Sequence, residues 1–173
     1  MIKIFLSLIL IISLSYAGWI GSLKPDKEVG NISLFIGQAS LEEKKDTLYG
    51  FDFGGNYYYN NGVLLGATFG LGYADESFEL NGKFKLGYSF GEIAKGLALY
   101  GIGDFSYLMY NRLNSQLKEK TTFAQGIGFG GGIEYRFNND WLFTASYTTT
   151  NMIPDIGINF DYNKALIGVG YTF

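Results

Sequence analysis

Charged side chains recur at alternating positions inside segments that are otherwise apolar or rich in glycine, which would place them together in a folded interior. They are Asp52, Lys83, Lys85, Asp104, Glu134 and Arg136. Lysines beside carboxylates could serve proton transfer or transport, but an unpaired buried ion costs several kcal/mol, so pairing alone explains such groups. We therefore predict a structural polar network in the interior and no catalytic residues.

Two pairs are expected within this network. Lys85 and Asp104 are predicted to lie at similar depth on adjacent strands, with Lys83 nearby, which favours a salt bridge between Lys85 and Asp104. Glu134 and Arg136 are two residues apart and therefore share one face of a strand.

The chain contains no histidine and no cysteine. Without imidazole, no side chain has an ordinary pKa suited to acid–base catalysis near neutral pH, and without thiols there can be no disulfide or thiolate metal site. We predict neither enzymatic activity nor a cofactor or metal. The formal net charge of −3 supplies no basic patch for phosphates, so no nucleic-acid partner is expected.

The segment Gly126-Ile-Gly-Phe-Gly-Gly131 matches the G-x-G-x-x-G pattern of dinucleotide sites. That pattern binds a nucleotide only where a strand turns into a helix, whereas here the alternation continues to Arg136. We expect the alternate glycines of this segment, Gly126 to Gly132, to keep one wall of a narrow interior thin and to leave space for bulkier neighbours.

Turn signals and alternation together predict eight strands. Their approximate ranges are 30–38, 48–59, 62–74, 78–90, 97–110, 121–137, 141–150 and 160–173. Tight connections are expected after the second, fourth and sixth strands, and longer polar loops after the others. This pattern predicts an all-β fold, an eight-stranded antiparallel up-and-down transmembrane β-barrel.

One face of all eight predicted strands carries no charge, although 17% of the residues are charged. The opposite face carries Glu79 and Lys164 in addition to the six residues of the network. A Lys or Arg facing lipid at mid-bilayer would cost roughly 2–4 kcal/mol, so the uncharged face is predicted to contact lipid.

Two strands leave the assignment of faces open. Within 97–110, Ala98, Tyr100 and Ile102 compete for the outward face. In the last strand, Phe160 and Tyr162 break the alternation that leads to Phe173. We expect a β-bulge near Asn163 to restore it.

Aromatic residues of the uncharged face gather near both ends of the predicted strands, as belts at two membrane–water interfaces would. The belt at the tight-turn end comprises Tyr57, Phe90, Tyr135, Phe137, Trp141, Tyr171 and Phe173. The belt at the loop end comprises Tyr49, Tyr73, Phe78, Tyr107, Phe123 and Tyr147. Such belts favour a membrane barrel over a soluble one.

The first residues predict a secretory signal peptide over 1–17, with a positive Lys3, a short apolar stretch and a small-x-small site ahead of cleavage between Ala17 and Gly18. The apolar stretch is shorter than the about 20 residues that a membrane-spanning helix needs. A short periplasmic segment over 18–29 and a barrel domain over 30–173 would follow.

The chain resembles the small eight-stranded outer-membrane barrels, which include the OmpA membrane domain, OmpX, OmpW and the opacity proteins. The resemblance rests on the signal peptide, the strand Leu99 to Tyr107 and the terminal Gly168-Val-Gly-Tyr-Thr-Phe173. It implies residence in the cell outer membrane among its lipid and lipopolysaccharide. In that family a terminal aromatic strand is the signal read by the barrel-assembly machinery, and its positions here are Ile167, Val169, Tyr171 and Phe173.

Three functions are considered. The first is a structural or surface-interaction role, in adhesion or envelope integrity. In this role, residues 111–120 and Ile153 to Ile158 would contact an extracellular or host-surface ligand. The alternative is that these two segments are only solvated connections. The second is a narrow channel for small or apolar solutes, as suggested for OmpW-like relatives. Its apolar lining would be Leu64, Tyr100, Ile102 and Leu166. The third is a soluble periplasmic ligand-binding barrel like the lipocalins.

Overall fold

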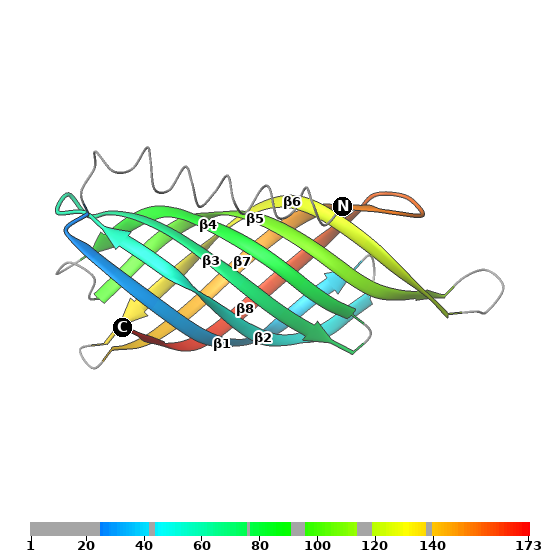
Figure 1. Ribbon diagram of the computed structural model, residues 1–173, viewed down its shortest axis with the longest axis horizontal. Coiled ribbons are helices and arrows are strands. Elements are labelled where there is room, and N and C mark those ends of the chain that lie inside the picture. Colours follow the sequence, from blue (N-terminus) through cyan, green and yellow to red (C-terminus); the bar gives the residue numbers. More distant parts are fainter. Residues whose placement is uncertain (1–24, 42–43, 76, 91–95, 114–118, 138–139) are drawn as a thin grey trace.

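Eight antiparallel strands form one closed barrel in the computed structural model, which describes residues 25–41, 44–75, 77–90, 96–113, 119–137 and 140–173. The strands follow one another around the barrel in chain order, and β8 pairs with β1 (Figure 1). They are β1 (Lys27–Leu41), β2 (Lys44–Tyr58), β3 (Val63–Ala74), β4 (Ser77–Phe90), β5 (Gly96–Leu113), β6 (Glu119–Arg136), β7 (Trp141–Pro154) and β8 (Phe160–Thr172). The predicted all-β up-and-down architecture is confirmed.

The strands are staggered as the sheet closes. The stagger follows from stepping from each residue to its partner on the next strand, beginning at Asn31 on β1. This path crosses all eight strands and returns to β1 at Leu41, so the stagger is ten residues, from position 31 to position 41. With ordinary strand spacings, eight strands and this stagger give a strand tilt of about 40° and a backbone radius of about 8 Å. A barrel this narrow is filled by its own side chains.

The two faces of the sheet lie as the alternation predicts. Every position assigned to the uncharged face is exposed or half-buried, and large apolar side chains such as Leu34, Phe84 and Ile167 are among the exposed ones. Ala98, Tyr100 and Ile102 are buried, which settles the open choice in β5. Among the described residues, no helix is long and apolar enough to cross a membrane.

The predicted bulge near Asn163 is wrong. The pairing of β7 with β8 runs without interruption from Trp141↔Tyr171 to Met152↔Phe160. Phe160 and Tyr162 therefore point inward together with Lys164, and both rings are buried. Alternation of apolar and polar residues fails as a guide here because this part of the interior accepts aromatic rings as readily as polar groups.

The strands also reach farther than the sequence indicated. Only residues 42–43 separate β1 from β2, and β5 and β6 continue to Leu113 and Glu119. The predicted contrast between short turns and long loops is therefore wrong, because hairpin pairing continues into the polar stretches expected to be loops. In Figure 1 the β5–β6 hairpin extends beyond the other strands. We call this end, where β1 meets β2 and β7 meets β8, the loop end, and the opposite end the turn end.

At the N-terminal side, β1 begins at Lys27, inside the segment 18–29 that was predicted to precede the barrel. The signal peptide over 1–17, the cleavage site between Ala17 and Gly18, and residues 18–24 lie outside the described residues.

Members of the two aromatic belts contact one another. At the turn end, ring centroids lie 4.8 Å apart for Tyr135 and Phe137 and 6.2 Å apart for Trp141 and Tyr171. At the loop end the closest pair is Tyr49 with Tyr73, at 5.4 Å. Such contacts between neighbouring rings hold the belts together beyond their individual burial.

The seam between the first and last strands closes as predicted. Ile32 and Ile36 pair with Tyr171 and Ile167. Beyond the last residue of β8, Phe173 N–H donates to the Gly30 carbonyl at 3.0 Å, and Gly30 N–H donates to the Phe173 carbonyl at 2.8 Å. The Phe173 ring covers Gly30, since a β-carbon built there would meet the ring.

This geometry predicts that Phe173→Ser lowers the yield of folded barrel several-fold, because the seam loses the ring that covers Gly30 while keeping the backbone. Phe173→Tyr is the matched control and should fold normally. Heat-modifiable mobility on gels after folding into lipid vesicles measures the yield. Equal yields for the Ser and Tyr variants would show that the ring has no part in closure.

Candidate functional site

The barrel interior holds charged side chains in three groups along its axis. Among the described residues these groups contain four acidic and four basic side chains, so the formal charges of the three groups cancel: Asp52, Glu79, Asp104 and Glu134 against Lys83, Lys85, Arg136 and Lys164. We call the groups the Glu134 cluster (Asn56, Tyr58, Lys85, Glu134, Arg136), the central pair (Asp52, Lys83) and the Lys164 cluster (Glu79, Asp104, Ser106, Thr150, Tyr162, Lys164).

The Glu134 cluster lies near the turn end. Tyr58 Oη donates to Glu134 Oε1 at 2.7 Å, and Asn56 Nδ2 donates to the same oxygen at 3.1 Å. Lys85 Nζ and an Arg136 guanidinium nitrogen each lie 3.5 Å from the carboxylate. Two hydrogen bonds and two cations therefore surround one buried carboxylate, which offsets its desolvation.

Aromatic faces complete the environment of both cations. Lys85 Nζ lies 4.8 Å from the centre of the Tyr100 ring, and the Arg136 guanidinium lies 4.7 Å from that of Tyr58. Contacts of this kind are worth about 0.5–2 kcal/mol, most when water is excluded. The cations are thus held by rings as well as by Glu134.

The central pair joins β2 and β4. Lys83 Nζ lies 2.8 Å from Asp52 Oδ2, and 5.3 Å from the centre of the Phe35 ring. Beside it, the other Asp52 oxygen and both amide atoms of Asn81 have no hydrogen-bond partner within the described part of the chain. The Asp52 and Asn81 side chains meet over Gly70. A β-carbon built on this glycine would collide with both of them.

The Lys164 cluster draws residues from four strands. Lys164 Nζ lies 2.5 Å from Glu79 Oε1 and 3.1 Å from Asp104 Oδ2, and it donates to Ser106 Oγ at 3.0 Å. Both the lysine and Glu79 are fully buried. One ammonium group thereby bridges two carboxylates.

Hydroxyl groups satisfy the remaining oxygens of this cluster. Thr150 Oγ1 donates to Asp104 at 2.7 Å, and Tyr162 Oη donates to Glu79 at 3.2 Å. The bond from Thr150 crosses Gly128, where a β-carbon would collide with the Thr150 side chain. The glycines of β6 do thin one wall, as predicted, and a cross-strand hydrogen bond occupies the space.

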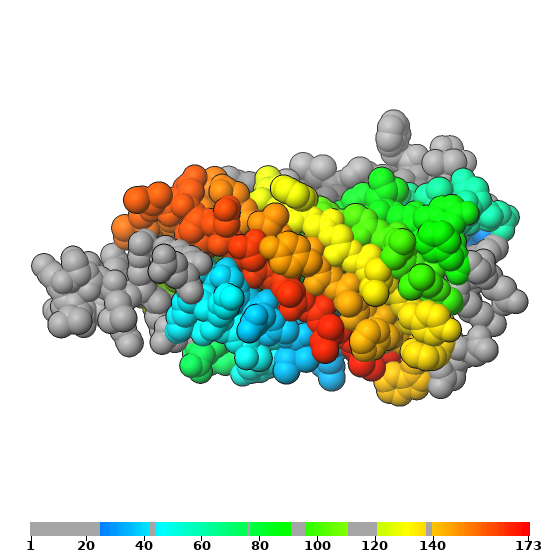
Figure 2. Space-filling model, turned by 180° about the vertical axis from the view of Figure 1, so that it is seen from behind, coloured from blue at the N-terminus to red at the C-terminus, as the bar shows by residue number. Residues whose placement is uncertain are grey.

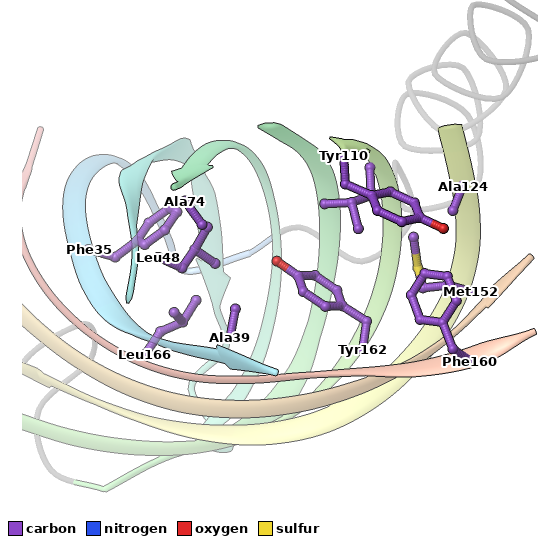
Figure 3. Close-up of a cluster of buried hydrophobic side chains, with 11 residues drawn as sticks. Phe35, Ala39, Leu48, Ala74, Tyr110, Ala124, Met152, Phe160, Tyr162 and Leu166 are labelled. Atoms are coloured by element: carbon purple, nitrogen blue, oxygen red, sulfur yellow. The ribbon is translucent and has the colours of Figure 1, made fainter. Parts of the chain in front are cut away.

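Apolar side chains close the loop end above the Lys164 cluster. Leu108, Met152 and Tyr110 are buried there, and the Tyr110 and Phe160 rings meet edge to face with centroids 5.7 Å apart. Figure 3 shows Tyr110, Met152 and Phe160 together, with Tyr162 pointing into the interior from β8. We call Leu108, Tyr110, Met152 and Phe160 the apolar cap.

The structure brings all six predicted network residues into the interior, but it changes one of the predicted pairs. Lys83, not Lys85, is level with Asp104 on the neighbouring strand. Lys85 binds Glu134, and Asp104 binds Lys164 from across the barrel. The predicted Lys85–Asp104 salt bridge is wrong, whereas the Glu134–Arg136 pair is confirmed at 3.5 Å.

Glu79 and Lys164 lie on the inner face, as the alternation predicts, but the predicted network does not include them. They form its shortest ion pair among those in the described residues. The sequence does contain one indication of this pair, because the two residues carry opposite charges on a face that has few charges. Counting depth on adjacent strands could not reveal the pair, since β4 and β8 are not neighbours in the sheet.

Chemically, this interior pairs its buried charges with one another. The cations of all three groups contact carboxylates. No group of three or more metal-binding acidic side chains occurs among the residues that the structure describes. The arrangement suits a plugged barrel.

Residues 20–173 match the family model described as "Outer membrane protein beta-barrel domain". No curated protein matches the sequence. Several solved structures share the fold at low sequence identity.

The N-terminal β-barrel domain of Pseudomonas aeruginosa OprF aligns with a TM-score of 0.53 at 20% identity, covering 83% of this chain and 99% of that one. Neisserial surface protein A aligns with a TM-score of 0.57 at 12% identity, covering 84% and 97%. Ail, the attachment invasion locus protein of Yersinia pestis, aligns with a TM-score of 0.55 at 14% identity, covering 84% and 98%. At these identities the likeness concerns the fold.

The Lys164 cluster predicts a large effect of one substitution. Lys164→Met should lower the free energy of unfolding by about 3–5 kcal/mol, because it leaves Glu79 and Asp104 buried without their shared cation. Urea titration in lipid vesicles measures it. Adding Glu79→Gln to Lys164→Met should recover part of the loss, since one buried charge is removed.

Lys45→Met is the matched control, because Lys45 is exposed on β2, and it should change stability by no more than about 0.5 kcal/mol. Equal effects of the Lys164 and Lys45 substitutions would mean that the buried lysine does not stabilise the barrel.

Proposed function

Because the chain belongs to the outer membrane protein beta-barrel family, we propose that it is a closed, non-catalytic barrel whose loop end serves surface recognition, in adhesion or in envelope integrity. The chain is an outer-membrane protein, and the soluble lipocalin-like alternative is set aside on that ground. The observation that carries the proposal is the filled interior, which leaves the surface as the place for function.

The interior supports a closed state rather than a narrow channel. A solute would have to pass the apolar cap, the Lys164 cluster, the central pair and the Glu134 cluster in turn. The residues considered as a channel lining are packed instead: Leu64, Tyr100 and Ile102 belong to one buried cluster, and Leu166 to another. Opening a path would separate ion pairs at a cost of several kcal/mol.

The non-catalytic part of the proposal rests on the chemistry of the same groups. A general base must reach a substrate, whereas Glu79, Asp104 and Glu134 are buried and bound to cations. The chain also has no histidine.

The described part of the loop end offers an apolar contact surface. Between β7 and β8 the chain turns at Gly157, whose φ is 122°, and Ile156 and Ile158 flank that glycine with exposures of 59% and 82%. Ile153 at the end of β7 is also exposed. Exposed apolar side chains clustered at one place mark contact sites more often than connections that only meet water.

The closed interior has a direct test. Purified protein in planar lipid bilayers should produce no reproducible channel events, because all three charged groups and the apolar cap obstruct the axis. A porin added to the same bilayer serves as positive control. Reproducible unitary conductance from this protein alone would overturn the closed state and favour the channel.

The role of the loop end has its own test. Ile156→Ser combined with Ile158→Ser should reduce adhesion of intact cells to host-cell layers, or weaken the detergent resistance of the envelope, several-fold at equal surface amount. Asn159→Ser, at an exposed position of the same connection, is the matched control. Unchanged adhesion and unchanged detergent resistance would count against recognition by this connection.

A further inference from the structure

The apolar outer surface is much taller on one side of the barrel than on the other. On β4 and β5 the outward positions are uncharged and mostly apolar from Phe78 to Phe90 and from Leu97 to Met109. With a strand tilt of about 40°, these runs rise about 30 Å along the axis.

On the opposite side the apolar runs are short. They extend from Trp141 to Tyr147 on β7, from Ala165 to Phe173 on β8 and its continuation, and from Ile32 to Ile36 on β1. The same geometry gives about 10–20 Å for these runs. Figure 2 shows this side, with β8 running between β7 and the first two strands.

Polar residues replace apolar ones toward the loop end of the short side. We call them the polar sector: Gln38, Thr149, Asn151, Asp161 and Asn163, all exposed or half-buried on the outer surface. They are also joined to their surroundings, since Tyr147 Oη donates to Asn163 at 3.2 Å and Asn151 Nδ2 donates to Asp161 at 3.3 Å.

The polar sector lies at the height of lipid-facing residues on the tall side. Asn151 is ten positions above Trp141, the first outward residue of β7, just as Tyr107 is ten positions above Leu97 on β5. Tyr107 belongs to the aromatic belt at the membrane–water interface, whereas the belt residue of β7, Tyr147, lies four positions below Asn151. A flat bilayer whose interface lies at Tyr107 would therefore place Thr149, which lies above Tyr147, at its hydrocarbon edge. In hydrocarbon, any hydrogen-bonding position of a hydroxyl or amide that stays without a partner is costly.

We propose that the outer leaflet is locally thin beside β7, β8 and β1, and that the polar sector binds the uncharged sugar headgroups of glycolipids in that leaflet. Thinning the bilayer beside a short apolar surface costs only fractions of a kcal/mol per ångström. It lets water and headgroups reach the polar groups of the sector. The binding is independent of recognition by the β7–β8 connection.

The chemistry of the sector selects the kind of headgroup. Amides and hydroxyls both donate and accept hydrogen bonds, as sugar hydroxyls do. Phosphate groups are bound by clusters of Lys and Arg, and the outward positions of the sector carry none on β7, β8 or β1. Its one charge, Asp161, would repel phosphate.

Spin labels test the local thinning in the full chain, which has no cysteine to remove. Thr149→Cys and Phe105→Cys, each eight positions above the first outward residue of its strand, would each be labelled and placed in phosphatidylcholine vesicles containing digalactosyl diacylglycerol. The label at 149 should collide mainly with an aqueous nickel complex, and the label at 105 with oxygen dissolved in lipid. Oxygen-dominated collisions at both positions would overturn the proposal. So would shielding of 149 from both reagents together with a dimeric mass, which would assign the sector to a second copy.

Lipid retention tests the choice of headgroup. Native mass spectrometry of barrels released from membranes with equal amounts of digalactosyl diacylglycerol and phosphatidylglycerol should show preferential retention of the galactolipid. Asn151→Leu with Asn163→Leu should reduce that retention several-fold, while Asn159→Leu in the β7–β8 connection should not. Preferential retention of phosphatidylglycerol, or equal retention by the wild type and the double variant, would overturn the proposal.

Discussion

Closure of the hydrogen-bonded sheet is the constraint on which the rest of this structure depends. Within hydrocarbon no water is present to bind free backbone groups, so each strand must be paired on both sides. The seam between β1 and β8 meets this requirement, and the two bonds between Gly30 and Phe173 extend it to the turn end. Eight strands closed with a ten-residue stagger then fix a radius that leaves room for side chains and little else.

The narrow interior explains why its charges are balanced and its glycines are placed on chosen walls. Lys164 can bridge Glu79 and Asp104 because β8 lies across the lumen within reach of a lysine side chain. The Thr150 bond to Asp104 passes over Gly128, so a larger side chain on β6 would remove it. Composition, charge balance and radius are therefore consequences of one geometry.

Much of the fold could be predicted from the sequence because alternation is a local property. The uncharged outer face was assigned correctly except where β5 was left open and where the expected bulge would have turned Phe160 and Tyr162 outward, and the inward positions of Lys83 and Glu134 followed from it. Contacts across the lumen could not be predicted, since they depend on the stagger, and this is why Asp104 was matched with Lys85 rather than Lys164. Strand ends were also missed, because polar residues above the membrane pair as readily as apolar ones within it.

The buried ion pairs have a further role in selecting the stagger. A slip of one residue between two strands turns every side chain to the opposite face, which would place charges in lipid. A slip of two residues keeps the faces but shifts one strand along the other, and it would separate Lys164 on β8 from Glu79 on β4. Hydrophobic side chains on the outer face tolerate such a two-residue slip, since one apolar residue replaces another. Besides the hairpin turns, the interior discriminates against it, because each cation there fits one set of carboxylates. The polar network thus contributes specificity of register, which the apolar outer surface cannot supply.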